Sequence, residues 1–138
     1  MEDVVECCRC IREQGSRLYI AADYPQFFTA EEYNYSDIPM VEFIVKHECL
    51  EECKNLISSV HLWGKKQNPK GRWIAHSGGL KSFLDDREIE VFMGMLSNFY
   101  DDGIGRYFVP EINASNEYVF ELADLCLKAG IEFVEQMC

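Results

Sequence analysis

The sequence predicts an α+β or α/β fold, with about four helices packed on one mixed sheet. Three observations support this class. Apolar residues recur with helical spacing in several segments, a basic segment near the middle has the signals of a central β-hairpin, and the C-terminal part predicts strand, helix and strand. With 138 residues and 48% hydrophobic content, the chain has room for one core, which predicts a single globular domain over 1–138.

The N-terminal part predicts two helices separated by irregular structure. The first helix covers 2–14 and ends at Gly15, because glycine readily adopts the left-handed conformation that stops a helix. Residues 17–22 have strand-like content, and the segment rich in Tyr, Phe and Pro that follows predicts a loop. A long helix is expected near 38–58, where the apolar residues keep the helical period.

The middle of the chain predicts a β-hairpin over 60–76. Two β-rich stretches flank an Asn-Pro-Lys-Gly sequence, in which Pro69 takes the second and Gly71 the fourth position of a type I turn. Pairing of the two strands is expected to bring Trp63 and Trp73 near the same end of the ribbon.

The C-terminal part predicts a helix, a strand, a second helix and a last strand. Pro110 implies an edge position, a bulge or the end of the first strand, because proline cannot donate to a strand ladder. The Ala129–Gly130 return favours a parallel strand pair with a right-handed crossover, which makes a C-terminal β-α-β unit. The expected elements are a helix from Ser82 or Asp85 to about Tyr100, a strand over 106–112, a helix from Asn113 or Ser115 to Gly130, and a strand over 131–137.

Charge is unevenly distributed along the chain. The net charge of −11 divides into −7 over residues 1–60, +5 over 61–82 and −9 over 83–138. The predicted hairpin region therefore holds five bases and no acid, together with both tryptophans. A solvated hairpin with protected edges explains this segment structurally, whereas an anionic ligand explains it functionally.

Acidic residues cluster at both ends of the helix that is expected to end near Tyr100. A small acidic domain is suited to bind a basic protein surface, because opposite charges steer two proteins together. The structural alternative is an acidic surface that only keeps the protein soluble. The acids expected to bind a protein partner are Asp85, Asp86, Glu88, Glu90, Asp101 and Asp102.

A second set of polar residues offers an alternative site for a small ligand or for catalysis. These residues follow the ends of two predicted strands, where open α/β sheets bind their ligands. If the two strands are parallel neighbours, the polar ends converge and a glycine backbone can approach a phosphate. The set consists of His76, Ser77, Gly78, Gly79, Lys81, Glu111 and Asn113. A turn followed by a capped helix would contain the same residue types without any such role.

No specific catalytic motif occurs in the chain. Ser77 lacks the glycine two residues earlier that a G-x-S-x-G turn requires, and no H-E-x-x-H, G-x-x-x-x-G-K-[ST] or G-x-G-x-x-G is present. The net negative charge disfavours direct nucleic-acid binding. No apolar run approaches the roughly 20 residues that span a bilayer, and the acidic N-terminal residues do not resemble a secretory signal, so we expect a cytoplasmic protein without membrane contact.

Seven cysteines raise the question of a metal site. Two pairs with suitable spacing make zinc binding conceivable. Packing is the favoured interpretation, because Cys7 and Cys8 share a helical stripe with Val4 and Ile11, and buried free cysteine behaves as a small hydrophobe. We therefore expect reduced thiols, no metal and no cofactor. The four candidate zinc ligands are Cys7, Cys10, Cys49 and Cys53.

The acidity and the C-terminal helix and strand joined by Ala129–Gly130 resemble small acidic nuclease inhibitors of the barstar kind. The likeness covers only this short segment and implies no family membership. The predicted function is a non-enzymatic inhibitor, of the toxin-immunity or anti-defence type, that engages a basic surface of a nucleic-acid-handling enzyme. The alternative is a small α/β enzyme or a nucleotide- or phosphate-binding module that uses His76, Ser77, Glu111 and Asn113. A third interpretation is a purely structural or oligomeric component.

Overall fold

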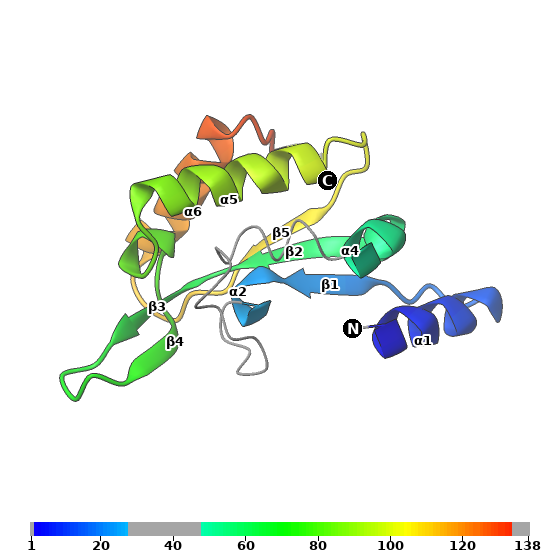
Figure 1. The fold of residues 1–138 in the computed structure, drawn as a ribbon, viewed down its shortest axis with the longest axis horizontal. Coiled ribbons are helices and arrows are strands. Elements are labelled where there is room, and N and C mark those ends of the chain that lie inside the picture. Colours follow the sequence, from blue (N-terminus) through cyan, green and yellow to red (C-terminus); the bar gives the residue numbers. More distant parts are fainter. Residues whose placement is uncertain (1, 28–47, 134–138) are drawn as a thin grey trace. The chain divides into compact units, whose positions relative to one another are not determined.

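The structure, a computed structural model, describes residues 2–27 and 48–133 (Figure 1). It contains helices, a three-stranded parallel sheet and a two-stranded antiparallel hairpin, which confirms the predicted α+β class. The described strands thus form two sheets in place of one mixed sheet. The chain divides into two compact units: unit one comprises Met1–His61 and Arg106–Val109, and unit two comprises Leu62–Gly105 and Pro110–Cys138.

Unit one begins with the predicted N-terminal helix. Helix α1 covers Glu2–Glu13, and Gly15 follows it with a φ of 88°, as a glycine helix stop requires. Val5 and Cys8 are the buried side chains of this helix, whereas Val4 and Cys7 are exposed. The helix and the burial of Cys8 are confirmed, whereas Val4 and Cys7 of the predicted stripe are exposed and Val5 is buried instead.

The sheet of unit one has the strand order β1-β2-β5. Strand β1 (Ile20–Asp23) lies parallel to β2 (Ile57–Leu62), and β5 (Tyr107–Pro110) borders β2 on its other side. Pro110 is the last residue of its strand, where its missing N–H costs no ladder bond. A short helix, α2 (Tyr24–Phe27), follows β1 in a segment for which a loop was expected.

The predicted helix near 38–58 is shorter at its C-terminal end. Its first part, 38–47, lies outside the described residues. Helix α4 covers Glu48–Cys53, a 3-10 turn η1 covers Lys54–Leu56, and Ile57 already begins β2. The prediction was wrong beyond Cys53. The residues from Ile57 onward pair with strands on both sides, and β-branched residues such as Ile57 and Val60 favour a strand over a helix.

Unit two contains the predicted hairpin. Strand β3 (Gly64–Gln67) pairs antiparallel with β4 (Trp73–Gly78). The connecting turn is closed by Asn68, whose side-chain oxygen accepts hydrogen bonds from the backbone N–H groups of Lys70 and Arg72 at 2.9 and 3.0 Å. Gly71 supplies the positive φ of 77° that the turn needs.

The two tryptophans lie at opposite ends of the hairpin, so the predicted proximity was wrong. Trp73 pairs with Gln67 beside the turn, whereas Trp63 directly precedes Gly64, which pairs with Gly78 at the base. Trp63 is 1% exposed and Trp73 is 45% exposed. One tryptophan therefore anchors the base of the hairpin, and the other belongs to its solvent-exposed tip.

The predicted helices of unit two begin at the expected caps. After a 3-10 turn, η2 (Leu80–Ser82), helix α5 covers Asp86–Phe99 with Asp85 as N-cap. Helix α6 covers Asn116–Lys128 with Ser115 as N-cap, and Gly130 follows it with a φ of 80°. The two helices pack against each other, and their buried faces are Ile89, Phe92, Met93 and Leu96 of α5 and Leu122, Leu125 and Cys126 of α6.

The predicted last strand over 131–137 lies mainly outside the described residues. Its described part, 131–133, is not in a strand.

Candidate functional site

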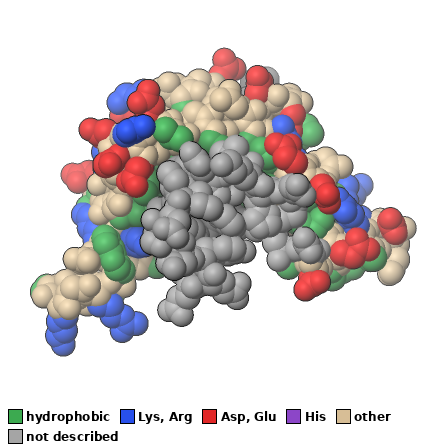
Figure 2. Space-filling model, in the orientation of Figure 1, with side chains coloured by type: hydrophobic (Ala, Val, Ile, Leu, Met, Phe, Trp, Pro, Cys, Tyr) green, Lys and Arg blue, Asp and Glu red, His purple; other side chains and the backbone are tan. Residues whose placement is uncertain are grey.

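The six acids predicted to bind a partner lie at the two ends of α5, in unit two. Asp85, Asp86, Glu88 and Glu90 surround its first turns, whereas Asp101 and Asp102 follow its last residue. A helix of 14 residues is about 21 Å long. The six acids therefore form two separate clusters, and Figure 2 shows acidic side chains gathered over the end of unit two where α5 begins.

The acids at the start of α5 divide into two functional kinds. The Asp85 carboxylate accepts from the Glu88 backbone N–H, and the Glu88 carboxylate accepts from the Asp85 N–H, both at 2.8 Å. This reciprocal capping box uses both carboxylates to hold the helix terminus. Asp86 and Glu90 take no part in it.

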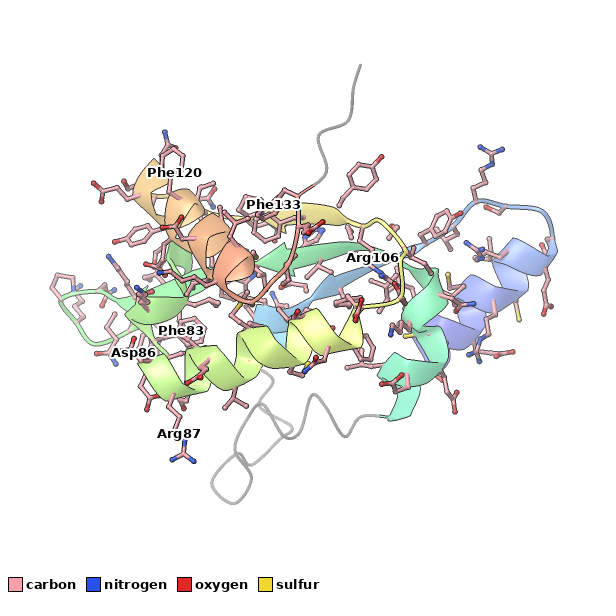
Figure 3. The ribbon with its side chains drawn as sticks, turned by 90° about the horizontal axis from the view of Figure 1, so that it is seen from above. Phe83, Asp86, Arg87, Arg106, Phe120 and Phe133 are labelled. Carbon is pink, nitrogen blue, oxygen red and sulfur yellow. The ribbon has the colours of Figure 1, made fainter. Side chains whose placement is uncertain are left out.

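Asp86 and Glu90 are exposed and lie one helical turn apart, on the same side of α5. Neither side chain makes a hydrogen bond or an ion pair within residues 2–27 and 48–133. Val91, which is 49% exposed, adjoins Glu90. We call Asp86, Glu90 and Val91 the acidic face. Arg87, which Figure 3 shows projecting from the start of α5, lies one helical turn from both Glu90 and Val91 and reduces the negative charge of this surface.

The second acidic cluster is mainly a turn. Asp101 and Asp102 are exposed, and the Asp102 carboxylate accepts from the Ile104 N–H at 3.0 Å. Gly103 follows with a φ of 72°. Asp102 therefore stabilises the chain reversal after α5, which is a common role for Asp in turns.

Two of the hairpin cations are held by aromatic rings. The Lys65 ammonium lies 5.1 Å from the ring centre of Trp73 and 5.3 Å from that of Phe83, and burial lowers the pKa of this lysine. The Lys66 ammonium lies 4.3 Å from the ring centre of Tyr118 and donates to its hydroxyl. Such cation–π contacts stabilise the hairpin within unit two.

The other two hairpin cations are free at its tip. Lys70 and Arg72 flank Gly71, and their exposed side chains form neither ion pairs nor hydrogen bonds with the described part of the chain. Figure 2 shows Lys and Arg side chains projecting from this tip. We call Lys70, Arg72 and the adjacent exposed Trp73 the hairpin tip.

His76, a member of the alternative site, has an unusual environment. Its φ is 58°, and no other non-glycine residue of the described segments has a positive φ. Its ring packs against that of Trp63, with 4.3 Å between the ring centres and 38° between the ring planes. Nδ1 lies 2.9 Å from the Glu111 carbonyl oxygen, to which it must donate, and the His76 carbonyl accepts from the Asn113 N–H at 2.8 Å. The strained backbone is therefore fixed from several directions.

The Ser77 side chain bridges the two strands of the hairpin where their backbone pairing is irregular. The pairing shifts register between Gly64 and Lys66. The Ser77 hydroxyl fills this gap, because it accepts from the Lys66 N–H at 2.9 Å and donates to the Ile74 carbonyl at 2.6 Å. The hydroxyl is thus engaged by the backbone of both strands and is not paired with His76.

The position expected to receive a phosphate is taken by a carboxylate of the protein itself. The Lys81 N–H donates to Glu121 Oε1 at 3.1 Å. A Cβ atom at Gly79 would overlap the Glu121 carboxylate, and one at Gly64 would overlap the Gly79 carbonyl. The two glycines therefore permit close packing of α6 and β3 against this segment, which is a structural reason for Gly78–Gly79.

The alternative site is thus assembled in part, and mainly through the backbone. The structure brings His76, Glu111 and Asn113 together, but Glu111 and Asn113 contribute a carbonyl and an N–H to the contacts described above. The prediction did not include Glu121 or Tyr118, which reach the same region from α6. Nothing in the sequence marks them, because their positions depend on how α6 packs.

A cavity of about 400 Å³ lies in unit one, between α1 and the residues leading into β1. Its lining is mainly apolar and includes Val4, Leu18 and Tyr19, with Asp3 and Cys7 as groups that can ionise. None of the residues of the alternative site lines it.

The described cysteines have two kinds of environment. Cys8, Cys53 and Cys126 are buried, and burial raises the pKa of Cys126 to about 11. Cys7 and Cys10 are exposed, and a hydrogen bond to the Glu6 carboxylate raises the pKa of Cys10. The described segments contain no cluster of three or more potential metal ligands; the side chain of Cys49 is not described.

Comparisons with protein-family models, curated proteins and solved structures found no match to this chain. Among the described helices, none combines the length and apolar character needed to cross a membrane.

Proposed function

We propose that this chain is a non-enzymatic protein-binding domain whose acidic face engages a basic surface of another protein. The observation that carries the proposal is the division of charge at the start of α5. Asp85 and Glu88 hold the helix cap, whereas Asp86 and Glu90 are exposed and unpaired within the described segments. A folded surface with uncompensated charge on a rigid helix is well placed to recognise an opposite charge.

The chemistry of the acidic face fits association steered by charge. Rim carboxylates act chiefly on the rate of encounter, whereas apolar contacts add affinity once the surfaces meet. Val91 supplies an exposed apolar group beside Glu90. The surrounding region from residue 83 onward carries a net charge of −9, which extends the attraction toward a basic partner.

The finer proposal concerns the identity of the partner. Enzymes that handle nucleic acids carry basic surfaces for the phosphate backbone. A small acidic domain that covers such a surface would act as an inhibitor, of the toxin-immunity or anti-defence type, in the cytoplasm. The capping box and the internal hydrogen bonds of Ser77 and Glu121 support a binding role over a catalytic one, because they give these polar groups structural partners.

The experiment compares two double charge reversals with the unchanged chain. Asp86→Lys with Glu90→Lys reverses the acidic face, and Asp124→Lys with Glu132→Lys makes the same change of net charge at other exposed positions. Each immobilised protein captures partners from a lysate of its own source, and the captured partner is purified. Its association rate with each variant and its activity on nucleic acid are then measured.

We expect the reversed acidic face to slow association by about tenfold or more at about 0.1 M salt, with the control near the unchanged rate. Arg87→Gln should act in the opposite direction and speed association. The proposal is overturned if the partner binds the reversed face as fast as it binds the unchanged chain. The finer proposal alone is overturned if the captured partner has no activity on nucleic acid.

A further inference from the structure

The hairpin tip is an exposed surface that the proposed function does not use. It combines two unpaired cations, Lys70 and Arg72, with the 45% exposed ring of Trp73. Exposed tryptophan beside arginine is a frequent composition at the centres of protein interfaces. The five bases in this region stand without a single acid between His61 and Ser82, so the tip fits a partner surface that is acidic.

A matching surface is present on the same chain. The acidic face offers two carboxylates, Asp86 and Glu90, and one exposed apolar side chain, Val91. The hairpin tip offers two cations and one exposed apolar ring. Each surface therefore holds the counterpart of the other, yet no ion pair joins them within one described molecule.

Both surfaces lie at the same end of unit two. The Lys65 ammonium lies 5.1 Å from the ring centre of Trp73, in the hairpin tip, and 5.3 Å from that of Phe83, only three residues before Asp86. Figure 3 shows Phe83 beside the hairpin and Asp86 close to it at the start of α5. A two-fold axis near this end can therefore place the tip of each copy on the acidic face of the other.

We infer that the hairpin tip docks on the acidic face of a second copy of this chain, in a reciprocal dimer. Each residue pair then occurs twice, as in any interface with two-fold symmetry. The contact is small, so we expect a dissociation constant on the order of 10–100 μM. The inference does not rest on the proposed function, because it concerns the purified chain alone.

The net charge of the chain allows docking of the tip on the face to be distinguished from general repulsion between copies. Copies that each carry −11 repel one another as whole molecules. The double substitution Asp86→Lys with Glu90→Lys changes the net charge from −11 to −7. General repulsion predicts that this variant associates more strongly, whereas docking of tip on face predicts that it associates less.

The test is sedimentation velocity of the purified chain over a micromolar concentration series at about 0.1 M salt, where charges more than about 10 Å apart are largely screened. One variant reverses the tip, with Lys70→Glu and Arg72→Glu. A second reverses the face, with Asp86→Lys and Glu90→Lys. A control variant, Arg17→Glu with Lys128→Glu, has the same net charge as the reversed tip but changes exposed bases elsewhere. Circular dichroism and melting temperature verify that all are folded.

We expect the unchanged chain and the control to dimerise, and each reversed variant alone to bind itself at least tenfold more weakly. An equimolar mixture of the two reversed variants should recover a heterodimer, because one contact is then restored with inverted charge and the other keeps the original charges of tip and face. A monomeric unchanged chain at the highest concentration overturns the inference. So does a mixture that stays monomeric, or a reversed face that dimerises more strongly than the unchanged chain.

Discussion

The hairpin and the start of α5 carry opposite charge but use it in the same way. At the hairpin, aromatic rings hold Lys65 and Lys66, whereas the cations at the tip project freely. At the helix start, the capping box holds Asp85 and Glu88, whereas Asp86 and Glu90 are unpaired among the described residues. In each region, two of four charged side chains are held by local contacts and two remain available.

The difference between the two regions lies in what supports them. The cap of α5 is formed by two of the acids, Asp85 and Glu88. These acids therefore stabilise the helix that carries the exposed Asp86 and Glu90. The hairpin instead depends on a buried anchor, Trp63, and on rings from outside its strands. Counting charges in the sequence therefore overestimates the charge available for binding about twofold in both regions, but for different physical reasons.

The largest expected effect is at the base of the hairpin. Trp63→Ala removes a fully buried ring that packs against His76, and we expect it to lower the free energy of unfolding by about 3–5 kcal/mol. Trp73→Ala, at the exposed tip, should cost less than about 1 kcal/mol. Urea denaturation of both variants measures the difference. Equal losses would mean that the two ends of the hairpin are not distinct in the way described.

The next effect separates the acids of the helix cap from those of the acidic face. Asp85→Ala deletes the N-cap acceptor and should lower the free energy of unfolding by about 1 kcal/mol. Asp86→Ala, one residue later, should change it by no more than about 0.5 kcal/mol. Thermal or urea unfolding of the pair provides the measurement, and a larger loss from Asp86→Ala would break the proposed division.

A smaller effect concerns the aromatic contacts of the hairpin. Burial lowers the pKa of Lys65, since the folded protein disfavours the charged form. Phe83→Ala exposes the ammonium and should raise this pKa toward its usual value. The lowered pKa also implies that, as pH rises through the Lys65 pKa toward that of the unfolded chain, this lysine loses its unfavourable contribution and stability increases. NMR titration of the Lys65 side chain in both proteins tests the shift, and an unchanged pKa in Phe83→Ala would exclude Phe83 as its cause.

The smallest effect lies in unit one and concerns the influence of the Glu6 carboxylate on the Cys10 thiol. Glu6→Gln removes the charged acceptor of the Cys10 thiol, so the pKa of Cys10 should fall and its thiolate should become more abundant. Alkylation of Cys10 near pH 8 should then accelerate several-fold. Cys126, whose pKa is raised to about 11 by burial, provides the control and should react only when the protein opens. Mass spectrometry of single sites records both rates. An equal Cys10 rate in both proteins would remove Glu6 as the cause.

The elements predicted correctly are those whose signals are local. The Asp85 and Glu88 pair, the glycines after two helices and the Asn-Pro-Lys-Gly turn each define an end or a turn within a few residues. The helix near 38–58 was overextended because the spacing of Ile57 and Val60 also suits a helix, and only their strand partners distant in sequence decide the outcome.

The candidate site was less accessible to sequence reasoning. The register of the hairpin pairs Trp73 with Gln67 beside the turn, and this alone leaves Trp63 at the other end, before β3 begins. The register also shifts between Gly64 and Lys66, where the Ser77 hydroxyl accepts from the Lys66 N–H. The role of Gly79 depends on Glu121, a residue from another helix. Similarly, the spacing of Asp85 and Glu88 predicts a capping box, but only the structure shows that both carboxylates are engaged in it while Asp86 and Glu90 remain exposed.

The two proposals share one surface, which has a consequence for binding. If the reciprocal dimer forms, Asp86 and Glu90 are covered by the hairpin tip of the second copy. A basic partner then has to displace that tip, so reversal of Lys70 and Arg72 to Glu should strengthen the apparent affinity for the partner. Titration of the purified partner against both proteins measures this. A weaker affinity would indicate that the tip contacts the partner directly.

The central claim is that the available acids of α5, and not its capping acids, carry recognition. The most direct measurement is the association rate of the captured partner with two matched neutralised variants of one helix. Asp86→Asn with Glu90→Gln and Asp85→Asn with Glu88→Gln remove equal charge, and the second pair keeps side chains that still form the cap. We predict that the first pair slows association several-fold and weakens its dependence on salt, while the second pair leaves the rate nearly unchanged. Equal slowing by both pairs, or slowing by the capping pair alone, would contradict the account.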